Sequence, residues 1–341
     1  LEQIHAAWSN RREAVARSAA ELTRHLRRIP DSLVASVDGS RPGSREVSRA
    51  AEELAARFDP RWGGFGAAPK FPSPHNLLFL LRYWRRTKET KARLMVTKTL
   101  QAMRLGGVFD HVGYGFHRYS TDRRWLLPHF EKMLYTQAQL IEAYLRAADV
   151  LGRDDFAAVA RGTLDFVLRD MRTTRGGFVA SFSAVDGDGN EGGVYLWTVD
   201  QLHRLLGEQD TALARRYWNM LEIPALDAGH LPRRGESVGQ IAEAIGQPEA
   251  AVVARLQSIR GRLLEARAQR VLPVDKMELA GWNGLLLAVV LIMGIVAMMA
   301  GPATHALLEE AEALMRQALS MQRRLLGEEH PEVAVNMSNV A

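Results

Sequence analysis

Apolar side chains recur at steps of three and four residues through much of the 341-residue chain, a spacing that predicts amphipathic helices. The clearest stretches cover residues 77–86, 91–105, 131–151 and 155–171. A further helix is expected to begin at Pro248, because proline is favoured in the first helical turn. Repeated helical hairpins with long loops between them favour an α-hairpin barrel or solenoid.

The period changes to that of strands between residues 177 and 198. Residues 178–182 and 194–197 are rich in aromatic and β-branched side chains and flank an acidic turn, which predicts one small β-hairpin. Thr198, followed by Gln201, has the pattern of a capping box, so the next helix is expected to begin there. The predicted fold class is mainly α: a partial barrel of helical hairpins with one small β-hairpin and a C-terminal helical tail.

The two ends of the chain have other patterns. Residues 1–26 predict one amphipathic helix, and residues 31–44, rich in Pro, Gly and Ser, predict a linker. Residues 285–303 predict an apolar helix without a charged side chain. A buried barrel helix and a membrane span both fit it, and the missing polar face favours the span slightly. Residues 304–341 predict a separate helical tail.

Composition excludes several functions. The chain has no cysteine, which excludes disulfide, thiol and cysteine–metal chemistry. Its net charge of +5 comes largely from arginines spread over helices, not clustered with stacking aromatics, so no nucleic-acid partner is expected. The charged N-terminal stretch is unlike a secretory signal. We therefore expect a cytoplasmic protein, with membrane association through residues 285–303 as the open alternative.

The densest set of reactive side chains lies in residues 106–135. Three histidines and two carboxylates occur there among aromatic rings, which is the composition of a ligand-binding cleft. Sugars suit such a cleft, because aromatic faces cover their C–H surfaces while charged groups hold their hydroxyls. The candidate catalytic residues, which could exchange protons with a substrate, are Asp110, His111, His117, His129 and Glu131. The alternative is that these side chains anchor loops at helix ends.

The sequence does not contain a metal-binding pattern. His111 and His117 are six residues apart, without an HExxH motif or a cysteine ligand. The acidic turn starts like an EF-hand loop, but Glu191 stands where glycine is required and Trp197 where a bidentate glutamate is required. We expect neither a metal nor a cofactor. Either the turn is solvated or it presents carboxylates to a substrate, and those carboxylates are Asp186, Asp188 and Glu191.

Several segments together resemble a known family, the thioredoxin-domain-containing proteins related to spermatogenesis-associated protein 20. The matching stretches are GGFGAAPKFP at residues 63–72, DHVGYGFHRY at 110–119, WLLPHFEKMLY at 125–135, GGVYLWT at 192–198, DK at 275–276 and WNGL at 282–285. The resemblance implies a thioredoxin-like domain followed by an (α/α)6 barrel similar to N-acylglucosamine 2-epimerases and six-hairpin glycosidases. It also implies substrate-binding residues at the barrel mouth, namely Arg118, Trp125, Trp197, Lys276, Trp282 and Asn283.

The chain departs from that family in two ways. The thioredoxin domain is missing apart from one helix, and the similarity to the barrel stops near Ala288. Residues 310–334 resemble instead a tetratricopeptide unit of the kinesin-light-chain type. The expected organisation is a helix left from a thioredoxin-like domain (1–30), a linker (31–44), a partial α/α barrel (45–284), an apolar helix (285–303) and a tetratricopeptide-like tail (304–341).

Two functions fit this organisation. The first is a carbohydrate-binding or carbohydrate-modifying barrel related to sugar epimerases and glycosidases, which truncation can leave inactive. The second is a non-catalytic helical scaffold that binds a protein partner through its tail, and a membrane-tethered version of either is a third alternative. The expected partners are thus a small carbohydrate and a protein. Thiol oxidoreductase activity is excluded by the missing cysteines.

Overall fold

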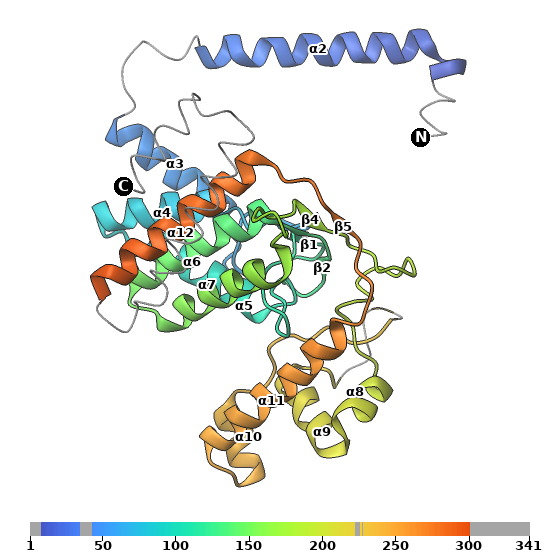
Figure 1. Ribbon diagram of the computed structural model, residues 1–341. Coiled ribbons are helices and arrows are strands. Elements are labelled where there is room, and N and C mark those ends of the chain that lie inside the picture. The colour runs from blue at the N-terminus through green and yellow to red at the C-terminus, as the bar shows by residue number, and fades with distance from the viewer. Residues whose placement is uncertain (1–7, 35–42, 222–225, 227, 301–341) are drawn as a thin grey trace. The chain divides into compact units, whose positions relative to one another are not determined.

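The computed structural model describes residues 8–34, 43–221, 226 and 228–300, without the side chains of residues 25–34 and 291–300. The described part is mainly helical, as predicted (Figure 1). Its helices are α2 (Arg12–Val34), α3 (Ser44–Arg57), α4 (Pro74–Thr87), α5 (Thr90–Leu105), α6 (Leu134–Leu151), α7 (Asp154–Phe166), α8 (Val199–Leu206), α9 (Glu208–Tyr217), α10 (Val238–Ile245), α11 (Glu249–Arg267) and α12 (Ala280–Ala300), with a π-helical turn η1 (Val167–Met171) after α7. The chain divides into two compact units, Leu1–Ala50 and Ala51–Ala341, and the second contains everything described below.

Two helical hairpins and one later helix form the first group of this second unit. Helix α4 packs against α5, and α6 packs against α7, close to the bounds that the periodicity predicts (Figure 1). Helix α6 buries Leu134, Ala138, Ile141 and Leu145, which recur at steps of three and four and therefore share one face. Helix α12 comes last in the described chain but lies against α6. The predicted fold class, a mainly helical assembly of hairpins, is confirmed.

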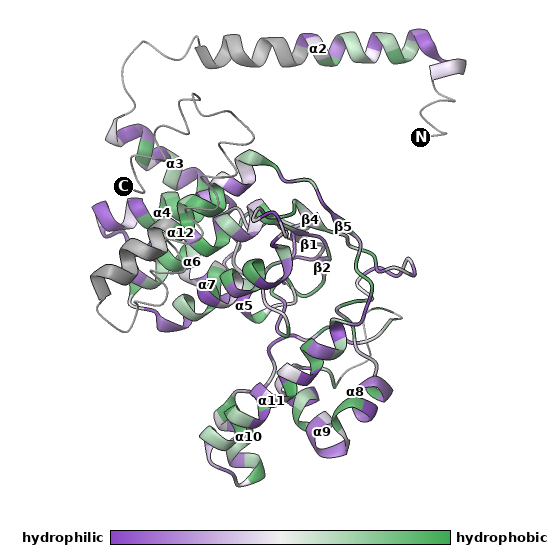
Figure 2. Cartoon of the chain, viewed as in Figure 1, coloured by the Kyte–Doolittle hydropathy of each residue, from purple (hydrophilic) through white to green (hydrophobic). Residues whose placement is uncertain are grey.

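Helices α8 to α11 form a second group with its own apolar core. Capping boxes begin α8 and α10: the hydroxyls of Thr198 and Ser237 each accept the backbone N–H three residues further on. The capping box expected at Thr198 is thus confirmed, and Pro248 lies one residue before α11 begins. Figure 2 shows hydrophobic and hydrophilic positions interleaved along these helices, as expected for helices with one buried face. The last residue of α11 is Arg267, which carries its guanidinium into the site described below.

The strands are short and lie between the helices. β1 (Tyr119–Ser120) pairs with β2 (Pro128–His129) as a small antiparallel hairpin. β4 (Ser181–Phe182) pairs with β3 (Lys132–Met133) on one side and with β5 (Val274–Asp275) on the other. This three-stranded sheet brings together segments that are far apart in the sequence.

The strand predicted at residues 194–197 is wrong. The backbone N–H groups of Tyr195 and Leu196 both donate to the carbonyl of Gly192, so this stretch is coiled into turns. The Arg270 guanidinium donates to the carbonyls of Gly193, Val194 and Leu196 at 2.7 to 3.0 Å. A partner strand would need these carbonyls, so the arginine replaces the hairpin that local sequence favours.

The first part of the apolar run buries one face against protein, while Leu285 and Ala288 are exposed. In α12 the side chains of Leu286, Leu287, Val289 and Val290 are all buried. Among the residues that the structure describes, no helix has the length and apolar composition needed to cross a membrane. Residues 301–303 of the run and the tail at 304–341 lie outside the described residues, as does the middle of the predicted linker.

Candidate functional site

One extended segment of chain, residues 128–133, separates two groups of polar side chains. Pro128, Phe130 and Lys132 are buried, whereas the residues between them are half-buried. Successive side chains of an extended chain point to opposite faces, so the two sets face different surroundings. We call the inner group the buried ionic cluster: Asp110, His117, Lys132, Tyr195 and Arg267. We call the outer group the aromatic strip: Phe71, Arg118, Tyr119, His129, Glu131, Tyr135, Glu191 and Trp282.

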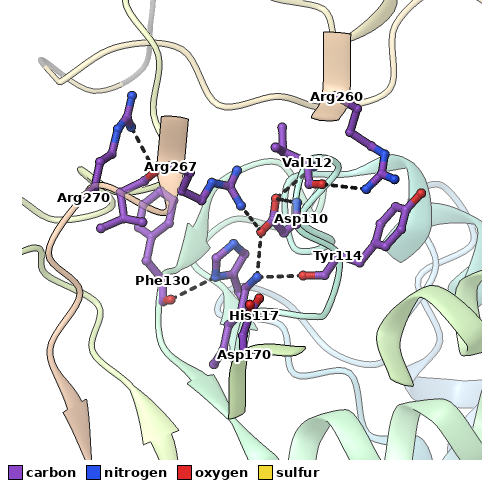
Figure 3. Close-up of polar contacts among 12 residues, drawn as sticks. Asp110, Val112, Tyr114, His117, Phe130, Asp170, Arg260, Arg267 and Arg270 are labelled. Atoms are coloured by element: carbon purple, nitrogen blue, oxygen red, sulfur yellow. Dashed lines mark hydrogen bonds and ion pairs between the residues drawn. The ribbon is translucent and has the colours of Figure 1, made fainter. Parts of the chain in front are cut away.

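Asp110 is at the centre of the buried ionic cluster (Figure 3). Its Oδ1 accepts the backbone N–H groups of Val112 and Gly113, and its Oδ2 accepts from Lys132 Nζ at 2.7 Å and Arg267 Nη1 at 2.5 Å. Burial alone would raise the pKa of this carboxyl, but the two cations hold it well below its usual value. Asp110 is therefore ionised and saturated with donors, which disfavours the acid–base role predicted for it.

The two cations of the cluster are held in aromatic surroundings. Lys132 Nζ also donates to the carbonyl of Tyr114 at 2.7 Å and lies 4.3 Å from the centre of the Phe166 ring. Burial lowers the pKa of Lys132 to about 8, although the Asp110 carboxylate acts in the opposite direction. The guanidinium carbon of Arg267 lies 5.2 Å from the centre of the Tyr195 ring.

His117 completes the cluster as a neutral imidazole. Its Nδ1 donates to the Phe130 carbonyl at 3.0 Å, a contact drawn in Figure 3. Burial, reinforced by the Lys132 charge, lowers the pKa of His117 to about 3. Four buried polar atoms of the cluster have no hydrogen-bond partner among the described residues: His117 Nε2, Tyr195 Oη, Arg267 Nε and Arg267 Nη2. Buried polar groups normally have partners, so these atoms call for an explanation.

A cavity of about 550 Å³ borders the buried ionic cluster. Asp110, Lys132, Tyr195 and Arg267 line it together with residues of η1, β4 and β5. Its volume is in the range of cavities that hold small molecules.

The aromatic strip begins with three rings stacked in series. Phe71 and Tyr119 stack with ring centres 4.8 Å apart, and Tyr119 and His129 stack with centres 4.9 Å apart. The Phe71 side chain is 48% exposed, which is unusual for a ring that could be buried in a core. The pairing of β1 with β2 places Tyr119 directly opposite His129, so the hairpin fixes the stack.

Charged groups follow the rings along the strip. His129 lies between two carboxylates: Nε2 is 3.2 Å from Glu131 Oε2, and Nδ1 is 3.6 Å from Glu191 Oε1. Arg118 Nη1 donates to Glu131 Oε2 at 2.8 Å, and hydrogen bonds from Arg118 to Glu131 and Tyr135 raise the pKa of the guanidinium.

The far end of the strip is again aromatic. Tyr135 meets Trp282 of α12 edge to face, with ring centres 4.9 Å apart. The strip therefore joins five separate segments of the chain and alternates apolar faces with charged groups.

Three other predicted substrate-binding residues are buried structural anchors. The Trp125 indole N–H donates to the carbonyl of Trp62, and a Cβ added to Gly64 would lie 2.5 Å from the Trp125 ring. Trp197 is buried under the Arg270 guanidinium at 4.0 Å. Asn283 exchanges two hydrogen bonds with the backbone of Phe178 and so fixes the start of α12.

The glycine-rich loop that packs on Trp125 has an ionic anchor of its own. Lys70 Nζ and Arg123 Nε both donate to Asp59 Oδ2 at 2.6 Å, and the lysine is fully buried. This arrangement gives the GGFGAAPKFP segment a structural role, and it places Phe71 on the strip.

The remaining predicted residues lie elsewhere. His111 lines a different cavity of about 390 Å³, and burial lowers its pKa to about 4. Asp186 accepts the backbone N–H groups of Asp188 and Asn190, so the acidic turn is largely closed on itself. Lys276 is exposed.

The sequence offered signals for some residues that the prediction omitted. Lys132 and Tyr119 lie inside the quoted motifs, and the alternation of residues 128–133 would have separated inner from outer side chains. No local signal marks Arg267, which lies 157 residues from Asp110 along the chain.

Known proteins resemble this chain over most of its length. The chain is 34% identical over 331 residues to spermatogenesis-associated protein 20 of Homo sapiens, covering 87% of this chain and 41% of that protein. It is 38% identical over 274 residues to the Mus musculus protein of the same name, covering 71% of this chain and 34% of the relative. The chain thus spans about two fifths of the length of these relatives. The predicted resemblance to spermatogenesis-associated protein 20-like proteins is confirmed.

Two further comparisons concern the tail and the fold. A family profile described as tetratricopeptide repeat matches residues 307–332, which confirms the predicted character of the tail. Among solved structures, the chain is similar to cellobiose 2-epimerase from Bacillus thermoamylovorans with a TM-score of 0.38 and 13% identity, covering 73% of this chain and 71% of that structure.

Proposed function

We propose that this protein binds carbohydrate on the aromatic strip. The observation that carries the proposal is the stack of Phe71, Tyr119 and His129, which is partly exposed and continues into the Arg118–Glu131 ion pair. A flat apolar face suits the C–H surface of a sugar ring, and adjacent carboxylate and guanidinium groups suit its hydroxyls. In the buried ionic cluster the corresponding groups, Asp110, Arg267 and the Tyr195 ring, are all buried.

Proton transfer to a bound sugar, as in epimerisation, falls to His129 in this proposal. His111 and His117 have pKa values lowered to about 4 and about 3, so both are neutral at pH 7 and have little tendency to take up a proton. His129 is half-buried and has a carboxylate beside each ring nitrogen. A histidine flanked by two carboxylates has the arrangement of a general acid–base group.

The binding test measures sugar affinity on the whole chain. Isothermal titration with D-glucose, N-acetyl-D-glucosamine and cellobiose should give saturable binding for at least one of them. Tyr119→Ala should weaken that binding about tenfold or more, because it removes the central ring of the stack. The matched control is Trp84→Ala, which removes another half-buried aromatic ring with cationic neighbours, on α4 and outside the strip. Equal effects of the two variants, or no binding of any sugar, would overturn the proposal.

The tail favours a second function, that of binding a protein partner. The tetratricopeptide match at residues 307–332 supports it, since such repeats generally act in protein recognition. We place this activity in the cytoplasm, because the chain has no cysteine. Deleting residues 304–341 should remove partner binding and leave the sugar affinity unchanged. Loss of sugar binding in this deletion would contradict the proposal that the tail and the strip bind their ligands independently.

A further inference from the structure

The cavity beside the buried ionic cluster is lined by more cations than the described residues can pair. Arg169 forms a two-pronged contact with Asp170 at 2.6 and 2.8 Å. Arg270 is bonded to three backbone carbonyls. The guanidinium groups of Arg169 and Arg270 therefore have several hydrogen-bond partners each, whereas that of Arg267 has one among the described residues.

Arg267 uses only one of its nitrogens. Nη1 donates to Asp110, while Nε and Nη2 have no partner among the described residues and are closed to bulk water. Nε and Nη2 form one edge of the guanidinium plane, with two parallel N–H groups at the spacing of two oxygens of a carboxylate or phosphate. An edge of this kind, left free and buried, carries a large desolvation cost. A bidentate oxyanion would remove that cost.

The local charge has the matching sign. Lys132 and Arg267 share one carboxylate, Asp110, so the inner wall of the cavity has one positive charge in excess. The remaining acid of the lining besides Asp110 and the paired Asp170 is Glu265, which is exposed. Tyr195 also lines the cavity, and its buried hydroxyl, which has no partner among the described residues, can donate one more hydrogen bond.

We propose that this cavity binds a small-molecule oxyanion, the carboxylate or phosphate group of a ligand, through the Nε–Nη2 edge of Arg267 and the hydroxyl of Tyr195. Because the edge is closed to bulk water, binding requires the Arg267 guanidinium to turn toward the cavity that it lines. The proposal is independent of sugar binding on the aromatic strip, since the two groups lie on opposite faces of residues 128–133.

The test titrates the whole chain with sodium acetate or sodium phosphate, against sodium chloride at equal ionic strength, and follows thermal unfolding. We expect acetate or phosphate to raise the unfolding midpoint in a saturable way, beyond the effect of chloride. Stabilisation by acetate alone identifies a carboxylate ligand, and stabilisation by phosphate alone identifies a phosphate ligand. Arg267→Lys should weaken the anion affinity about tenfold or more, because a lysine cannot form the bidentate contact.

Two further variants keep the test decisive. Arg260→Lys changes the same residue type on the same helix α11, but Arg260 contacts the carbonyl of Val112 and lies outside the cavity lining, so the anion affinity should stay unchanged. Tyr195→Phe removes an unpartnered hydroxyl, so it should leave the anion-free protein at least as stable and weaken anion binding a few-fold. Equal stabilisation by all three salts would overturn the proposal, and so would equal affinities of the Arg267→Lys and Arg260→Lys proteins.

Discussion

The aromatic strip and the buried ionic cluster use the same short stretch of chain, yet their side chains have opposite surroundings. Glu131 and Arg118 are 29% and 40% exposed and form their ion pair in contact with water. Lys132, one residue after Glu131, forms its ion pair with Asp110, and these two side chains are only 1% and 4% exposed. Water screens the first pair, whereas the second depends on every partner being present. The strip therefore keeps its ion pair in contact with water, whereas the cluster keeps its ion pair inside the fold.

The largest expected effect comes from removing the shared carboxylate of the cluster. Asp110→Asn leaves Lys132 and Arg267 buried without a counter-charge, which should cost about 3–5 kcal/mol of unfolding free energy. Urea unfolding at pH 7 measures this. Adding Lys132→Met to Asp110→Asn should recover part of the loss, because one of the stranded charges is removed. A cost below about 1 kcal/mol would show that the ion pairs of Asp110 contribute as little as the water-screened ion pair of the strip.

Acidification should also destabilise the protein, chiefly through the two histidines whose pKa values are lowered most, His111 and His117. His111 and His117 have folded-state pKa values near 4 and near 3, below the ordinary value of 6.5. Below pH 6.5 the unfolded chain therefore binds more protons than the folded one, so stability is full above this pH and falls as pH decreases toward 4. Each histidine contributes up to about 1.4 kcal/mol per pH unit, or roughly 2–3 kcal/mol together between pH 6 and pH 5.

Urea unfolding at several pH values would check this dependence. His117→Asn keeps a donor for the Phe130 carbonyl but cannot titrate, so it should reduce the slope by about half. An unchanged slope would show that His117 does not carry the effect.

Stability should also depend on pH in the alkaline range because of Lys132, whose pKa burial lowers to about 8. Between about pH 8 and pH 10 the unfolded lysine stays protonated while the folded one loses its proton, so stability should rise with pH. The rise is at most about 1.4 kcal/mol per pH unit. It should end near pH 10, where Tyr144 and Tyr195, whose pKa values burial raises, ionise more easily in the unfolded chain. Lys70, whose pKa burial also lowers, contributes in the same direction. Lys132→Met should therefore reduce the rise, and an unchanged rise in that variant would exclude Lys132 as a cause.

The sequence predicted the parts of this molecule that depend on local pattern. Apolar residues that repeat about every 3.6 positions indicate a helix with one buried face. Because α4 to α7 have this pattern, they lie close to their expected bounds. The strand at 194–197 failed because Arg270, from a distant segment, bonds the carbonyls that a strand would need. The pairing of Asp110 with Arg267 could not be predicted, because sequence spacing carries no information about contacts 157 residues apart.

For the candidate site, the motifs indicated the segments that carry the polar side chains, but they did not distinguish the buried side chains from the partly exposed ones. Asp110 and His117 were grouped with His129 and Glu131 because all four lie within one stretch of sequence. Composition reports which side chains are near each other along the chain, and only burial shows which of them are in contact with water. The half-buried position of His129 beside two carboxylates is the feature that keeps it as the candidate for proton transfer.

The smallest expected effect on stability lies on the strip. Glu131→Gln removes the charge that Arg118 and His129 face, but these groups remain partly hydrated, so the unfolding free energy should change by less than about 1 kcal/mol. Sugar affinity should fall by more than the stability change suggests, since the carboxylate is proposed to hold hydroxyl groups directly. Urea unfolding and sugar titration of the same variant compare the two. The opposite result would be that Glu131→Gln destabilises the fold as strongly as Asp110→Asn and leaves sugar affinity unchanged. The ion pair of the strip would then serve stability, as the ion pair of the cluster does, and the proposed difference between the two regions would be wrong.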